Sequence, residues 1–172
     1  MKKGLALLGI LLLSACSAQK PVSTAEIAAR FSGDFSAKIT VETAEDVFQM
    51  EATKTGMSIA FSVTEPPELS GLSTVLEDGR VTLTYEGISM DFPPERLPAK
   101  APFLQMGTAV FALQDESAFS VEQRKTGLLV SGNGFSALLE PESLALKELV
   151  FAAGKGKMTV GDFVFSGENE KN

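Results

Sequence analysis

The sequence predicts a mainly β (α+β) fold, in which a strongly curved antiparallel sheet forms an unclosed half-barrel covered by short helices. Apolar and polar residues alternate with period two over most of residues 35–165. Short turn sequences containing Gly separate these segments into roughly nine to eleven strands, and an open sheet of that size curls or closes. A curled sheet has a concave apolar face, and two apolar helical segments, 24–31 and 102–114, are available to cover it.

Residues 1–15 have the features of a lipoprotein signal peptide. Two lysines precede an apolar run that is shorter than the roughly 20 residues needed to span a bilayer. The run ends in Leu13-Ser14-Ala15-Cys16, which resembles the bacterial lipobox. The resemblance implies cleavage before Cys16 and a diacylglycerol on its sulfur. The alternatives are an ordinary secretory signal with a chance cysteine, or a short amphipathic anchor.

Lipidation of Cys16 determines the expected location of the protein. Because several acyl chains hold a protein stably at a bilayer, Cys16 is interpreted as a membrane anchor and residues 16–22 as its tether. We therefore expect an extracytoplasmic protein on the bacterial cell membrane, or on the outer membrane if the host has one.

A short helix begins the domain proper. Ser23 and Glu26 have the spacing of a capping box, and the apolar residues that follow share one face. This pattern predicts an amphipathic helix over 24–31 that ends at Gly33.

Alternating segments joined by tight turns follow this helix. Lys54-Thr55-Gly56 is predicted as a turn, and so is Asp78-Gly79, because Asp-Gly readily adopts the positive φ of a hairpin turn. The strands predicted in this half of the chain are 35–43, 47–53, 57–64, a strand ending at 76, 81–85 and 88–92.

A proline-rich segment divides the strands into two groups. Residues 93–102 contain four prolines, which cannot donate to a sheet ladder, so this segment is predicted as a loop at the edge or mouth of the sheet. The apolar segment 102–114 is predicted as a helix because a proline begins it. Strands are predicted over 118–124, 128–130, 135–140, 144–152 and 157–165, so that 23–166 form a single domain with a polar tail at 167–172.

Composition excludes several classes of function. The chain has no histidine and one cysteine, which removes imidazole-based catalysis and the commonest metal ligands. Without residues 1–15 the formal net charge moves from −7 to −9, which disfavours binding to nucleic acid. We expect no enzyme activity, no cofactor and no metal site.

The order of elements resembles the bacterial lipoprotein carrier and receptor (LolA/LolB-like) family. The likeness rests on the capped helix leading into FSGDFSAKITV, the paired strands DVFQMEATKTGMSIAFSVTEPPELSG, the hairpin LEDGRVTLTYEG and the closing LLEPESLALKELVFAAGKGKMTVGDFVF. It implies an unclosed barrel whose apolar cavity holds acyl chains. In the carrier a basic residue helps to hold the lid helices, and Arg30 and Arg96 are the positional candidates here.

Two functions remain open for this domain. In the first, the protein binds an acyl chain, a lipid or a lipidated partner in the half-barrel. In the second, the barrel is filled and the protein docks a protein partner in the cell envelope. The residues predicted to contact lipid, each of which is also a candidate for simple core packing, are Phe48, Met50, Ile59, Phe61, Leu83, Tyr85, Phe103, Met106, Val110 and Phe111.

Overall fold

The computed structural model describes residues 21–42, 47–152 and 157–167. These residues form one antiparallel sheet of eleven strands that does not close on itself, in the order β6-β5-β4-β3-β2-β1-β11-β10-β9-β8-β7. The predicted fold class is therefore confirmed. The strands are β1 (Phe35–Glu42), β2 (Val47–Thr55), β3 (Ser58–Glu65), β4 (Ser73–Glu77), β5 (Arg80–Tyr85), β6 (Ile88–Phe92), β7 (Phe119–Arg124), β8 (Gly127–Gly132), β9 (Phe135–Leu139), β10 (Leu146–Phe151) and β11 (Lys157–Phe165).

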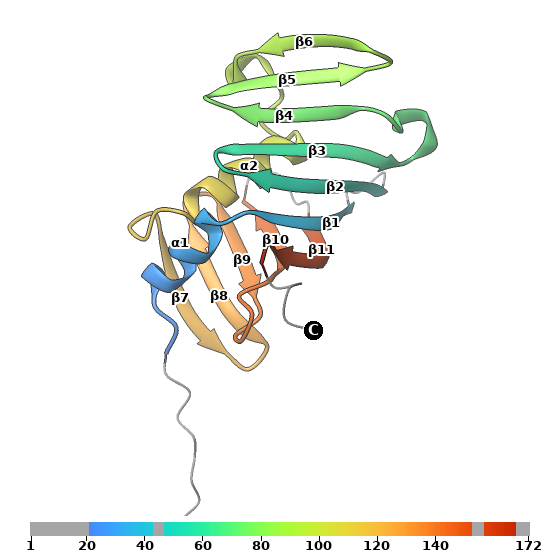
Figure 1. Ribbon diagram of the computed structural model, residues 1–172. Helices are drawn as coiled ribbons and strands as arrows, with labels where there is room; N and C mark the ends of the chain where they lie inside the picture. The colour runs from blue at the N-terminus through green and yellow to red at the C-terminus, as the bar shows by residue number, and fades with distance from the viewer. Residues whose placement is uncertain (1–20, 43–46, 153–156, 168–172) are drawn as a thin grey trace, which may run out of the picture.

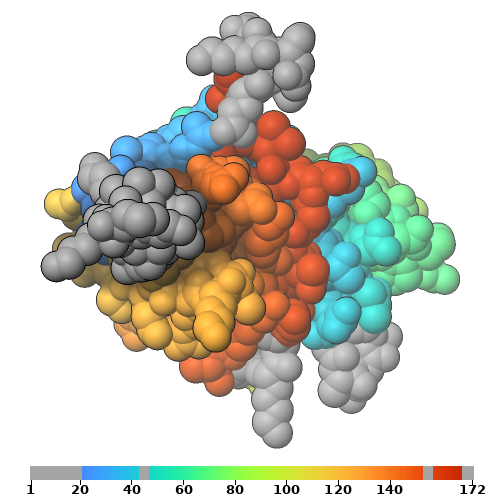
Figure 2. Space-filling model, turned by 90° about the horizontal axis from the view of Figure 1, so that it is seen from below, coloured from blue at the N-terminus to red at the C-terminus, as the bar shows by residue number. Residues whose placement is uncertain are grey.

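The sheet consists of two meanders joined at its centre. Strands β1 to β6 form the first and β7 to β11 the second, and β1 pairs with β11 from Phe35↔Phe165 to Glu42↔Lys157. The two meanders differ strongly in direction, so that the sheet curves around the helices (Figure 1). In the space-filling view the red residues of β11 lie beside the cyan residues of the N-terminal strands (Figure 2).

Helix α1 (Thr24–Ser32) packs under one end of this curve. Ser23 and Glu26 make both hydrogen bonds of the capping box, as the sequence predicts, and Gly33 is the C-cap. The fully buried Phe31 ring lies 5.6 Å from the Phe165 ring, measured between centroids. The helix packs against β7, so it covers the concave face at that edge of the sheet (Figure 1).

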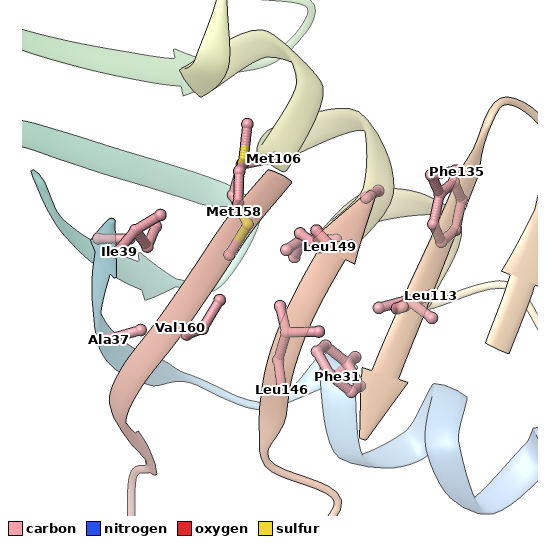
Figure 3. Close-up of a cluster of buried hydrophobic side chains, with 14 of the residues drawn as sticks. Phe31, Ala37, Ile39, Met106, Leu113, Phe135, Leu146, Leu149, Met158 and Val160 are labelled. Atoms are coloured by element: carbon pink, nitrogen blue, oxygen red, sulfur yellow. The ribbon is translucent and has the colours of Figure 1, made fainter. Parts of the chain in front are cut away.

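Helix α2 (Pro102–Ala112) lies inside the concavity. It begins at Pro102, as predicted, and ends two residues earlier than the predicted 114. Gly107 allows close packing on the sheet, because a Cβ there would lie 2.7 Å from Cδ2 of Leu76. Side chains of both helices and of β1, β9, β10 and β11 meet in the buried core (Figure 3). The helix is buried through Met106, Gly107, Ala109 and Val110, and its C-cap Leu113 is also fully buried.

Two predictions about the β2–β3 hairpin are wrong. Lys54 belongs to β2 and points inward with Met50 and Ala52, whereas the sequence pattern assigned it to a turn. Met57 was predicted as the first residue of the strand 57–64, but it lies in the turn before β3 and is 64% exposed. The reason is that the alternation of β2 continues to Thr55, which moves the turn to Gly56 and Met57.

Short 3-10 turns lie in two of the connections. One is η1 (Pro67–Leu69), between β3 and β4. The other is η2 (Pro94–Arg96), within the proline-rich segment that leads from β6 to α2. This segment is a loop beside α2, in agreement with the prediction from its prolines.

Candidate functional site

Two hollows flank helix α2 where it lies in the mouth of the half-barrel. The larger has a volume of about 280 Å³ and the smaller about 180 Å³. Pro94, Leu104 and Thr108 line both. The larger is also lined by Ala99, Gln105, Asn133, Gly134, Phe135 and Phe151, and the smaller by Leu76, Glu77, Asp78, Gly79, Arg80, Val81 and Phe111.

Helical spacing explains which residues of α2 face these hollows. Leu104, Thr108 and Phe111 follow one another at i, i+4 and i+7, so they share one face of the helix. The opposite face carries Met106 and Val110, which are fully buried. Thr108 is the polar residue at the centre of the outer face and is exposed. One face of α2 therefore packs in the buried core, and the opposite face lines the two hollows.

The predicted lipid-contacting residues fall into three groups. Met50, Ile59, Phe61, Met106 and Val110 belong to one buried cluster. Phe48, Phe103 and Phe111 are partly buried against that cluster. Leu83 and Tyr85 lie further out on β5. Of the ten residues, Phe111 is the one that lines a hollow described here.

Sequence reasoning did not single out Thr108 and Pro94, which line both hollows together with Leu104. The spacing of Leu104 and Thr108 was available as a signal, because the polar residue Thr108 follows Leu104 by four positions and so shares its face of the helix. The position of Pro94 depends on the path of the loop over α2, and no local pattern in the sequence encodes that path.

The concave face becomes exposed towards β6. Tyr85 pairs with Ile88 and Leu83 pairs with Met90, so these side chains lie on the same face of the sheet. Ile88 is 67% exposed and Met90 is 54% exposed. The Tyr85 hydroxyl donates a hydrogen bond to the backbone carbonyl of Glu68 at 3.0 Å, which leaves its ring at the surface. An apolar surface therefore continues from the core to the β6 edge.

A buried lysine contacts the end of helix α1. Lys54 is 1% exposed, and its Nζ donates hydrogen bonds to the carbonyl oxygens of Ser32 and Gly33, each at 3.0 Å. A cation at a helix C-terminus interacts favourably with the helix dipole. Burial lowers the pKa of Lys54 from its usual 10.5, while the nearby charge of Asp34 opposes that shift.

The two arginines proposed from the family resemblance have other surroundings. The guanidinium carbon of Arg30 lies 4.1 Å from the centroid of the Phe165 ring, a cation–π contact. Arg96 lies in η2 and is exposed. Lys54, which was not a candidate for that role, is a basic side chain that contacts the end of α1.

Two further features bear on chemistry and membrane contact. Within residues 21–42, 47–152 and 157–167, no three acidic, cysteine or histidine side chains are grouped so that they would hold a metal ion. In the same part of the chain, neither helix has the length and apolarity needed to cross a bilayer. Cys16, predicted to be lipidated, lies outside the described residues.

The fold and its hollows define a half-barrel protein with a helix lying in its mouth. No family model matches the chain, and no curated protein matches it. A solved structure of an uncharacterized conserved protein from Thermus thermophilus is similar, with a TM-score of 0.54 and 12% identity over 81% of this chain and 83% of that chain. That similarity shows the fold.

Two further solved structures give lower scores. A LolA superfamily protein from Nitrosomonas europaea has a TM-score of 0.46 and 10% identity, over 84% of this chain and 94% of that chain. A DUF1329 family protein from Desulfovibrio piger has a TM-score of 0.47 and 8% identity, over 84% of this chain and 92% of that chain.

Proposed function

We propose that this chain is a membrane-anchored extracytoplasmic lipoprotein that binds an acyl chain, from a lipid or a lipidated partner, in its half-barrel. The observation that carries the proposal is the pair of hollows on the two flanks of α2, which share Pro94, Leu104 and Thr108. Both hollows lie along the outer face of α2, and displacement of the helix would join them with the space beneath it into one groove open to solvent.

The volumes support a site that enlarges on binding. The two hollows measure about 280 and 180 Å³, below the roughly 300–1,000 Å³ usual for small-molecule sites. Each one holds only part of a long chain. Helix α2 contacts the sheet through apolar side chains such as Met106, Val110 and Leu113. An acyl chain can replace such non-directional contacts without leaving a buried polar group unpaired.

The anchoring part of the proposal rests on the lipobox-like segment that ends at Cys16. The described domain begins close behind it, with α1 starting at Thr24. Residues 16–22 are too few to carry the domain far from the bilayer, since an extended chain spans at most about 3.3–3.6 Å per residue. The tether therefore holds the half-barrel close to the membrane surface, where lipid is available.

Blocking both hollows with one substitution tests the lipid-binding site. Thr108 is exposed and lines both hollows, so Thr108→Trp fills them without removing a buried side chain. The matched control is Ala29→Trp, at an exposed position of α1. Membranes containing the full chain are incubated with a photoactivatable fatty acid, and covalent labelling of the protein is measured after illumination.

If the acyl chain binds in the hollows, we expect the labelled peptides to come from α2 and from the strands that line the hollows. Thr108→Trp is expected to abolish most of this labelling, and Ala29→Trp to leave it unchanged. Equal labelling of both variants, or labelling confined to residues far from α2, would contradict the acyl-binding site. Anchoring is tested separately with labelled palmitate in cells. Palmitate that is incorporated into the wild type and absent from Cys16→Ser supports it.

A second candidate function is docking of a protein partner in the envelope. The exposure of Ile88 and Met90, 67% and 54%, favours it, because together with the 39% exposed Tyr85 these side chains form an exposed apolar area on one face of the sheet. If photolabelling at the hollows fails while Cys16 is lipidated, this second function becomes the better account of the domain.

A further inference from the structure

The two edges of the sheet differ in how they are protected. At one edge, β7 lies against α1 and carries the charged pair Glu122 and Arg124, whose side chains are 3.0 Å apart. Charged residues and covering helices are the usual means of preventing edge strands from pairing with other chains. At the other edge, β6 pairs with β5 alone in the part of the chain that the structure describes, and no helix covers it (Figure 1).

Hairpin geometry identifies the free hydrogen-bonding groups of β6. Glu86 and Gly87, with φ of 50° and 80°, form a two-residue turn that places Tyr85 opposite Ile88. The residues that close such a turn are a hydrogen-bonded pair, and these pairs alternate along an antiparallel ladder. The backbone groups of Ile88, Met90 and Phe92 therefore face β5. The backbone N–H and C=O groups of Ser89 and Asp91 face the open edge.

We propose that β6 pairs in antiparallel orientation with β6 of a second copy of this chain, with the two-fold axis at Met90. Ser89 of each copy then lies opposite Asp91 of the other in a hydrogen-bonded pair. All the outward N–H and C=O groups of these two residues obtain partners. An isologous interface of this kind requires a self-complementary strand, and β6 meets that condition.

Charge disfavours one of the two neighbouring registers, and the Glu86-Gly87 turn disfavours the other. If the second strand is shifted by two residues in one direction, Asp91 lies opposite Asp91 of the second copy. Like charges directly opposite each other are destabilising. Sliding in the other direction leaves the outward groups of Asp91 opposite Gly87, in the turn. In the proposed register each Asp91 faces a serine, and its carboxylate accepts a hydrogen bond from Thr82 Oγ1 at 2.7 Å on the polar face.

The same register accounts for the exposed apolar side chains. Met90 meets Met90 of the second copy as a non-hydrogen-bonded pair, in which side chains approach most closely. Ile88 lies opposite Phe92 of the second copy. The side chains exposed at 67% and 54% are thereby brought together on the concave face, which becomes continuous between the two copies.

Cysteine cross-linking tests the register in the full chain. In a non-hydrogen-bonded antiparallel pair the Cα atoms lie about 4.5 Å apart, within the range that a disulfide spans. Membranes containing Met90→Cys are oxidised, and the fraction of disulfide-linked dimer is measured. Met57→Cys, at another exposed methionine, and the wild type, whose single cysteine is Cys16, are the controls.

A second pair of variants isolates the backbone contribution. In the Met90→Cys background, Ser89→Pro removes the outward amide donor while the β5 ladder keeps its own bonds, since proline is tolerated at such edge positions. Ser89→Ala is the matched control, because it keeps the backbone amide donor but loses the serine hydroxyl, as Ser89→Pro also does. Ser89→Pro removes two hydrogen bonds per dimer, one from each copy, so we expect the dimer fraction to fall roughly tenfold or more with Ser89→Pro and to persist with Ser89→Ala. Far-UV circular dichroism compares the folding of the two variants.

Three results would overturn the proposal. One is dimer formation by Met90→Cys no greater than that of Met57→Cys. Another is an equal dimer fraction with Ser89→Pro and Ser89→Ala, which would show that backbone pairing is not involved. The third is cross-linking of Met90→Cys to a different protein in place of a second copy, which would assign the β6 edge to that protein.

Discussion

The aromatic cluster beneath α1 predicts a large loss of stability when Phe31 is truncated. The Phe31 ring is 0% exposed and lies within 6.4 Å of three other rings, those of Phe35, Phe163 and Phe165, measured between centroids. Phe→Ala at a buried site costs about 3–5 kcal/mol. Because edge-to-face ring pairs add about 0.5–1.5 kcal/mol beyond burial, Phe31→Ala is expected in the upper part of that range.

The length of α1 determines the form that this loss takes. The helix has nine residues, and isolated helices shorter than about 12–15 residues are marginal in water. Without Phe31 the helix loses its contact with the aromatic cluster and keeps Ile27 as its fully buried side chain, so it is expected to unfold locally before the sheet does. Phe31→Leu keeps part of the apolar volume but loses the ring contacts, so it is expected to cost less than Phe31→Ala.

Equilibrium urea unfolding followed by far-UV circular dichroism measures these differences. Val47→Ala is the control, because Val47 is apolar and 56% exposed, and it is expected to change the free energy of unfolding by less than about 0.5 kcal/mol. If Phe31→Ala lowers the free energy of unfolding by less than about 1 kcal/mol, the docking of α1 through this cluster is refuted.

Further predictions concern a buried charge, a close contact and a helix cap. Since burial lowers the pKa of Lys54 below 10.5, the unfolded chain binds more protons between the lowered value and 10.5. The free energy of unfolding should therefore rise with pH across that window, and in pH-dependent urea titrations Lys54→Met should lack the rise. A Cβ at Gly132 would overlap the Phe135 ring, so Gly132→Ala should lower the free energy of unfolding by about 1–3 kcal/mol. Gly161→Ala is the control and should not lower it in this way, because a Cβ at Gly161 would meet no other atom. Ser23→Ala removes the α1 cap and should lower the free energy of unfolding by about 0.5–2 kcal/mol, while a null effect in the same assay would mean that the capping box adds no stability.

Local patterns predicted the elements well where their cause was local. The alternation in β1 and the Asp78-Gly79 turn depend on neighbouring residues alone, and both positions of that turn have positive φ in the structure. Lys54 shows the limit of such patterns. The sequence assigned it to a turn with Thr55 and Gly56, but the carbonyl groups that it contacts belong to Ser32 and Gly33, more than twenty positions earlier in the chain.

The candidate site was less predictable because it depends on strand order. Leu83 and Phe61 have the same alternating pattern, but Phe61 lies on β3 inside the sheet, whereas Leu83 lies one strand from the open edge. The hollows depend on the path of the loop through Pro94 over α2. Periodicity predicts which side of a strand is apolar, and the packing of distant segments decides whether that side is covered.

The pairing of β1 with β11 has a consequence for how the chain reaches its native state. Every other strand pair in the sheet joins strands that are consecutive along the chain, whereas Phe35 pairs with Phe165 across most of the domain. Local hairpins form rapidly, and contacts between distant residues carry the larger entropic cost of closing a long loop. The rate-limiting step of folding is therefore expected at this one central pairing. Until it forms, the backbone groups with which β1 and β11 pair in the native sheet have no partner in each other.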